Sequence, residues 1–312
     1  MTKQPLRPVG YITLPTHAAA GGFDHAAVHA ASGHVYVAHT ANNAVDVFDP
    51  STRKALFSIP GLAGVAGVIV SDEAQLIITS NRSENTIGIF PPGAGPDLRK
   101  VAVGKRPNGL AYAHRHRLVL VANVGEAALP SSHTLSVVNL DKGVVQNEIA
   151  VPGQSRWAIY DPDAQVFFVN IADPAQIVAV DAQRPTAVAR TFPIPAAGPH
   201  GLDLDRATHR LFCACDEGTL ITLEATSGKV VSRQQLSGAP DVIFFNREHQ
   251  HLYVAIGDPG VIDVFDTASM QIIGSVATEK GAHTLALAPA GDSVYAFLPG
   301  SHRAAVYQVQ AV

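Results

Sequence analysis

Residues 251–276 read HLYVAIGDPGVIDVFDTASMQIIGSV, three strand-like apolar segments separated by turn residues. Residues 33–59 follow the same design, as GHVYVAHTANNAVDVFDPSTRKALFSI. A further apolar segment precedes each block, so one unit holds about four short strands. The unit recurs seven times, and equivalent positions fall at residues 24, 66, 108, 156, 200, 241 and 283. A period near forty residues with four strands per unit is typical of a β-propeller, one blade per repeat. We therefore expect an all-β, seven-bladed propeller forming a single domain over residues 1–312.

The last repeat is too short to form a whole blade. Only 30 residues run from position 283 to the end, and a fourth strand is missing. The segment GYITLPTHAAAGG at 10–22 matches the fourth-strand segment ALFSIPGLAGVAG at 55–67 in its pattern. The sequence thus predicts that an N-terminal strand over 10–15 completes the last blade beside 304–309, which removes the exposed sheet edges.

Composition excludes several classes of function. The net charge is −4 and no basic stripe is present, so no nucleic-acid partner is expected. Apolar runs have strand length, so no membrane span is expected. The first fifteen residues lack the apolar core of a signal peptide, which predicts a cytoplasmic protein. Cys213 and Cys215, two apart on one strand, are expected to be free thiols. We expect a monomer.

The repeats resemble those of the YVTN, or YncE-like, propellers. The resemblance rests on blocks such as 33–59 and 251–276 and covers residues 10–312. It implies the seven-bladed fold and leaves function open, because members of this family include lyases, lactonase-like proteins and binding modules. Neither a C-x-x-C-H haem motif nor a dinucleotide glycine fingerprint is present, so no haem and no nucleotide cofactor are expected.

Departures from the repeat indicate where a site would lie. In a propeller blade the residue before the innermost strand and the residue after the second strand reach the same end of the central funnel. The first set differs from blade to blade and comprises Asp24, Ala66, Asn108, Arg156, His200, Asp241 and His283. The second set comprises His39, Asn81, Asn123, Asn170, Cys215 (with Asp216), Gly257 (with Asp258) and Leu298. We interpret Asn81, Asn123 and Asn170 as loop caps, with a substrate contact as the alternative for Asn170, and Cys215 as a buried apolar residue.

Roles follow from the residue types. Three convergent titratable groups in a concavity indicate a site, so His200, His283 and Asp241 are the predicted catalytic residues. Asp241 would orient an imidazole. Substrate contacts are predicted for four residues, Arg156, Asn108, His39 and Asn170. The Arg156 guanidinium offers a fork to a carboxylate or phosphate.

Two further resemblances suggest a reaction. Gluconolactonase-like propellers, similar here in fragments such as PNGL at 107–110, imply a divalent cation (Mg²⁺, Ca²⁺ or Zn²⁺) at Asp24, Asn108 and Asp241. Streptogramin-lyase-like propellers, similar in PHG at 199–201 with His283, imply histidine acid–base chemistry beside Mg²⁺. The prediction is a metal-assisted hydrolase of the lactonase type, or a lyase, acting on a small molecule in the funnel. A non-catalytic scaffold that binds a ligand or a protein partner stays open as the alternative.

Overall fold

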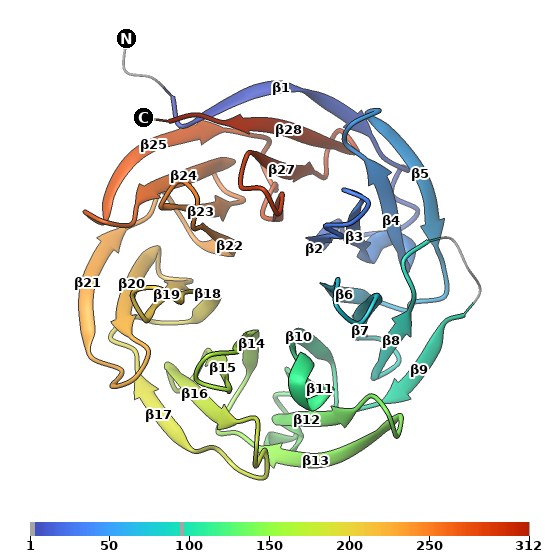
Figure 1. Ribbon diagram of the computed structural model, residues 1–312, viewed down its shortest axis with the longest axis vertical. Helices are drawn as coiled ribbons and strands as arrows, with labels where there is room; N and C mark the ends of the chain where they lie inside the picture. Colours follow the sequence, from blue (N-terminus) through green and yellow to red (C-terminus); the bar gives the residue numbers. More distant parts are fainter. Residues whose placement is uncertain (1–3, 94–96, 312) are drawn as a thin grey trace.

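The computed structural model describes residues 4–93 and 97–311, so residues 1–3, 94–96 and 312 of the expected domain lie outside it. Seven four-stranded antiparallel sheets are arranged radially around a central axis (Figure 1). In six of them the strands follow chain order from the axis to the rim, with bounds as follows: β2 Phe23–Val28, β3 Val35–His39, β4 Ala44–Asp49, β5 Lys54–Ile59; β6 Val65–Ser71, β7 Leu76–Asn81, β8 Thr86–Phe90, β9 Arg99–Ala102; β10 Pro107–Ala113, β11 Leu118–Asn123, β12 Thr134–Asn139, β13 Val144–Ala150; β14 Ser155–Asp161, β15 Val166–Ile171, β16 Gln176–Asp181, β17 Arg190–Pro193; β18 Pro199–Asp205, β19 Arg210–Cys215, β20 Thr219–Glu224, β21 Val230–Gln235; β22 Pro240–Asn246, β23 His251–Ile256, β24 Val261–Asp266, β25 Gln271–Ala277.

The seventh sheet joins the two ends of the chain. Its order is β1, β28, β27, β26, where β26 is Leu285–Leu287, β27 Ser293–Leu298 and β28 Arg303–Val309. Strand β1, Leu6–Thr13, pairs antiparallel with β28 from Leu6↔Val309 to Thr13↔Arg303. The predicted closure is confirmed. The predicted bounds 10–15 were wrong by a few residues, because the pairing continues through a bulge at Pro8–Gly10 and begins at Leu6.

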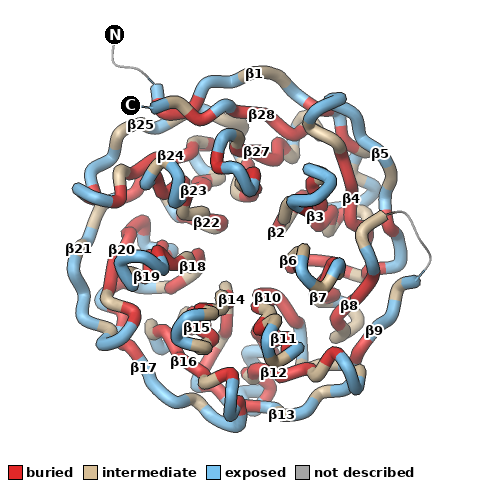
Figure 2. Tube along the Cα trace, viewed as in Figure 1, coloured by how far each residue is buried: buried red, intermediate tan, exposed pale blue. Residues whose placement is uncertain are grey.

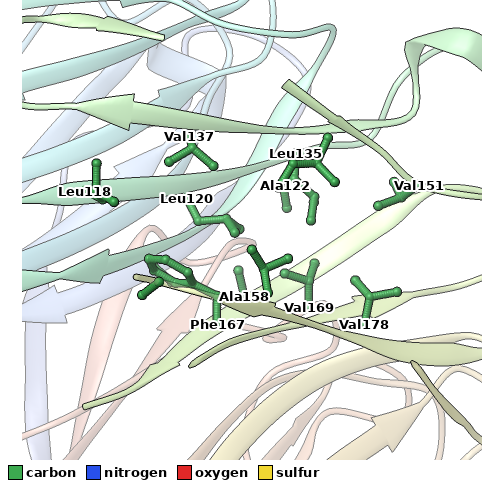
Figure 3. Close-up of a cluster of buried hydrophobic side chains, with 14 of the residues drawn as sticks. Leu118, Leu120, Ala122, Leu135, Val137, Val151, Ala158, Phe167, Val169 and Val178 are labelled. Carbon is green, nitrogen blue, oxygen red and sulfur yellow. The ribbon is translucent and has the colours of Figure 1, made fainter. Parts of the chain in front are cut away.

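Packing between neighbouring blades forms the core. Figure 3 shows the contact of the third blade with the fourth, where Leu120 and Val137 face Phe167 and Val178. Each of these side chains is at most 1 % exposed. Burying one such side chain contributes roughly 1.5–3 kcal/mol. The strands at the inner and middle positions of each sheet are therefore buried. Side chains of the outermost strands are mostly exposed or half-buried (Figure 2).

Short helical turns occupy three connections: η1 Thr40–Asn42, η2 His114–His116 and η3 Pro130–Ser132. The turn η3 belongs to the loop between β11 and β12 in the third blade. Nowhere in 4–93 or 97–311 does a helix have the length and apolar character needed to cross a membrane.

Removing residues 1–13 deletes β1 and exposes the edge of β28. We expect the truncated protein to lose cooperative unfolding or to aggregate, because Leu6 and Ile12, each 1 % exposed, leave the core together with a full row of backbone hydrogen bonds. Thermal unfolding followed by circular dichroism measures this. Tyr11→Ala is the control, since Tyr11 lies on the same strand but is 53 % exposed. A truncated protein that melted like the full-length one would refute the closure.

Candidate functional site

A β-bulge places six of the seven residues of the first predicted set, those of the first six blades. The register between the inner two strands shifts by one residue directly after its first pair, for example between Phe23↔His39 and Ala26↔Val37. The same shift follows Val65, Pro107, Ser155, Pro199 and Pro240 in the next five blades. A bulge redirects the side chain of the extra residue. The residue after each of these pairs therefore leaves the regular ladder at the mouth of the channel.

These residues converge on one cavity of about 510 Å³. Six of the seven first-set positions line it, namely Asp24, Asn108, Arg156, His200, Asp241 and His283. The seventh, Ala66, is fully buried and outside the lining. The repeat register thus located the funnel residues from the sequence alone.

Asp241 lies between two histidines. Its Oδ1 is 3.3 Å from Nε2 of His200, and its Oδ2 is 3.8 Å from Nε2 of His283. On its other side, His200 places Nδ1 at 2.7 Å from Oδ1 of Asp216. Burial disfavours the charged imidazole, but the two carboxylates outweigh it and raise the pKa of His200 above its ordinary value. His200 therefore holds a proton more firmly than a free histidine does.

Asp24 and Asn108 share a different partner, Arg82. The Arg82 Nη1 lies 3.3 Å from Oδ2 of Asp24, and Nη2 donates a hydrogen bond to Oδ1 of Asn108. Burial works against ionisation of Asp24, yet Arg82 and His25 together lower the pKa of this carboxyl group. Two of the three predicted metal ligands thus contact a guanidinium. Within the described residues, no three His, Cys, Asp or Glu side chains are grouped closely enough to hold a metal ion.

Arg156 supplies a cation without a partner. Its Nε is buried and donates no hydrogen bond, and throughout 4–93 and 97–311 no carboxylate forms an ion pair with it. The side chain lines the cavity. An unpaired guanidinium at a concave surface is suited to a carboxylate or an oxyanion.

The second predicted set lies largely outside the cavity. His39 is 0 % exposed and is held by Asp46, with 2.6 Å from Nδ1 to Oδ2. Asn170 is also 0 % exposed and donates to the backbone oxygens of His200 and Gly201 at 2.9 and 3.1 Å. Neither side chain reaches a ligand in the funnel; Asn170 instead positions the strand that carries His200. Asn81 and Asn123 donate to Thr86 and Thr134 across their own loops, as predicted for loop caps.

Sequence reasoning missed Arg82 and underused Asp216 because it took the last residue of the second strand as the funnel residue, and it also misaligned two blades. The strand pairing makes Ile171 and Ile256, not Asn170 and Gly257, equivalent to Cys215. Side chains alternate along a strand, so the residue after this position is the one that turns to the funnel. That residue is Thr40, Arg82 and Asp216 in three of the blades. A strict alignment of the second strands would have found them.

The two cysteines are free thiols, as predicted. Cys213 and Cys215 are both 0 % exposed, and their sulfur atoms lie 3.8 Å apart. Burial raises the pKa of Cys213 far above its ordinary value, so this thiol stays protonated.

Comparison with known proteins agrees with this architecture. A solved structure titled Kuenenia stuttgartiensis hydrazine synthase matches with a TM-score of 0.83 over 97 % of this chain and 100 % of that chain. The protein is a seven-bladed β-propeller. The two chains are 14 % identical, so the match shows a shared fold alone. No family model matches the sequence, and neither does any curated protein.

Asp216→Asn should lower the pKa of His200, because it removes the closer of the two carboxylates. Proton NMR titration of the imidazole resonances measures the shift. Asp258→Asn is the matched control, since Asp258 pairs with Lys280 at 3.1 Å rather than with a histidine. The raised folded-state pKa means that His200 stabilises the fold at pH below its ordinary pKa of 6.5, and that this contribution is lost as the pH rises through the folded value. An unchanged His200 titration in Asp216→Asn would contradict the predicted contact.

Proposed function

We propose that the funnel is the active site of a hydrolase or lyase acting on a small carboxylate or lactone. The observation that carries the proposal is that both oxygens of Asp241 face imidazole nitrogens, at 3.3 and 3.8 Å, on the wall of a 510 Å³ cavity. Paired titratable groups in different environments are the arrangement that general acid–base catalysis requires. The likeness of the repeats to YVTN, or YncE-like, propellers supports a funnel site but selects no reaction.

The two histidines take different roles because their environments differ. Two carboxylates flank His200 and favour its protonated form, so it serves as the general acid. His283 contacts Asp241 alone and its side chain is 38 % exposed, so it serves as the general base. In ester hydrolysis, His283 would take a proton from the attacking water and His200 would give a proton to the leaving alkoxide. In elimination, His283 would remove the proton α to the substrate carbonyl, a double bond would form as the bond from the β carbon to the leaving group breaks, and His200 would protonate the leaving group.

Arg156 binds the anionic part of the substrate. Its guanidinium stabilises the negative charge that develops on the carbonyl oxygen in either reaction. Arg82, which is 31 % exposed, neutralises Asp24 and keeps this half of the funnel compatible with an anion. Both cations line the same cavity as the acid–base pair.

A divalent cation is the second version of this proposal. The predicted ligands are Asp24, Asn108 and Asp241, and Arg82 already occupies the oxygens of the first two. A metal would have to displace the guanidinium, which costs the ion pair and the hydrogen bond. The arrangement therefore favours a reaction in which arginine supplies the positive charge.

His200→Gln and His283→Gln should each reduce turnover by about 10²–10⁴-fold, the usual contribution of general acid–base help. The assay is a screen of lactones and of hydroxy and unsaturated carboxylic acids, followed by kcat and KM on the best substrate. His116→Gln is the control, because His116 lies in η2 and contacts Gln165 at the other end of the channel. Turnover that persists unchanged in the double histidine variant would place the reaction elsewhere. Saturable binding in the funnel without any turnover would favour the non-catalytic scaffold.

The midpoint of thermal unfolding distinguishes the metal-free reaction from the metal-assisted one. A ligand that binds only the folded state raises the midpoint by mass action. We expect Mg²⁺, Ca²⁺ and Zn²⁺ to leave the midpoint of the wild type equal to that with a chelator. A rise that Asp241→Asn abolishes and Asp258→Asn retains would establish the metal-assisted version instead.

A further inference from the structure

The channel holds a second cavity at the end opposite the funnel. Its volume is about 630 Å³, and it lies along the later residues of the inner strands and the turns that follow them. Most of its lining is apolar, with large side chains from Ile69, Tyr112, Trp157, Ile159, Phe244 and Leu287. Volumes of about 300–1,000 Å³ with mainly apolar walls are usual for small-molecule sites. His25 borders this cavity and the funnel alike, and its ring stacks on Trp157 with 4.0 Å between centroids.

Charged side chains at the rim of this cavity have polar side-chain partners nearby. Arg206 binds Asp163 through two nitrogens, at 2.9 and 2.7 Å. The carboxylate of Glu73 lies 3.7 Å from Nε2 of His114. Asp72 likewise lies 3.5 Å from Nε2 of His29.

Asp203 is the exception. It lines the cavity, and among residues 4–93 and 97–311 no lysine, arginine or histidine lies within ion-pair distance of it. The strand register makes it equivalent to an apolar residue in each of the other six blades: Ala27, Ile69, Ala111, Ile159, Phe244 and Ala286. One blade alone therefore brings a carboxylate into an otherwise apolar ring.

Two backbone amides donate hydrogen bonds to the Asp203 carboxylate. Its Oδ1 accepts from the Leu204 amide at 2.8 Å, and Oδ2 accepts from the Phe245 amide at 2.6 Å. Two neutral donors do not balance a charge, and burial raises the pKa of Asp203 to about 6. At neutral pH the group is therefore ionised at a cost that a neutral acceptor would avoid. A cation delivered by a ligand would remove that cost.

We propose that this second cavity binds a small hydrophobic amine, whose ammonium group pairs with Asp203 and whose apolar body packs against Trp157 and the neighbouring aliphatic side chains. The site is separate from the funnel chemistry. It favours a primary or secondary amine over an alcohol of the same shape, because only the charged group compensates the carboxylate.

Trp157 allows a direct measurement, since it is the only tryptophan in the chain and lines the cavity. The probes are 2-phenylethylamine and its neutral counterpart 2-phenylethanol, titrated at pH 7.5 while tryptophan emission is recorded. We expect a saturable change with the amine and binding at least about tenfold weaker with the alcohol, as for loss of one charge-assisted hydrogen bond. Equal affinity for the two probes, or no saturable change with the amine, would overturn the proposal.

Two variants distinguish a direct pairing of the ammonium with Asp203 from a general effect of negative charge near the cavity. Asp203→Asn keeps an oxygen for a backbone amide and should weaken amine binding at least about tenfold without changing alcohol binding. Glu73→Gln removes a charge from the rim of the same cavity and should leave both affinities unchanged. Equal losses in the two variants would show that the ammonium does not pair with Asp203.

The pH dependence of the wild type provides a test that needs no variant. Amine affinity should fall as the pH falls through about 6, where Asp203 takes up a proton, whereas alcohol affinity should stay constant. The other titratable groups lining the cavity are His25, Asp72, Glu73, Tyr112, His114, Tyr160 and Arg206, whose guanidinium is paired with Asp163. Protonation of His25 or His114 would also repel an amine, so the fall must be absent from Asp203→Asn. If that variant does not fold, a wild-type affinity that is flat between pH 5 and 7.5 still contradicts the proposal.

Discussion

Pairing of β1 with β28 is the constraint on which the rest of the structure depends. Each sheet buries both of its faces against its neighbours, so the seven sheets are stable only as a complete ring. A single strand from the other end of the chain closes that ring (Figure 1). The closure brings Leu6 and Ile12 into the two clusters that flank the last blade. Without it, the blades on either side would present apolar faces and unpaired backbone groups to water.

A closed ring leaves the inner edges of seven strands facing one channel. Regular strands there would offer similar side chains from every blade. The bulges interrupt this regularity at the channel mouth in six blades, and the residues placed there differ in type around the ring. The framework can therefore stay repetitive while the site varies. Stability resides in the contacts between blades, and chemistry resides at the one position per blade where the ladder is broken.

Electrostatic balance differs between the two ends of the channel. In the funnel, Arg82 faces Asp24, and His200 lies between Asp216 and Asp241. Arg156 alone is left without a counter-ion, which favours an anionic ligand. At the other end Asp203 is left without one, which favours a cationic ligand. His25 and Trp157 lie where the two environments meet.

The sequence alone determined the fold and the funnel ring, because a repeated strand pattern places equivalent residues at equivalent points of the ring. The period predicted seven blades, and the deficit of the last repeat predicted the closure through the N-terminal strand. Asp24, Asn108, Arg156, His200, Asp241 and His283 were likewise located by counting residues. Which side chains contact one another was decided only by the tertiary structure. The pairing of Arg82 with Asp24, the contact of Asp216 with His200 and the burial of His39 depend on the bulges and on which face of a strand turns inward. A shift of one residue in the strand register turns inward-facing side chains outward, and only the assembled ring determines the register.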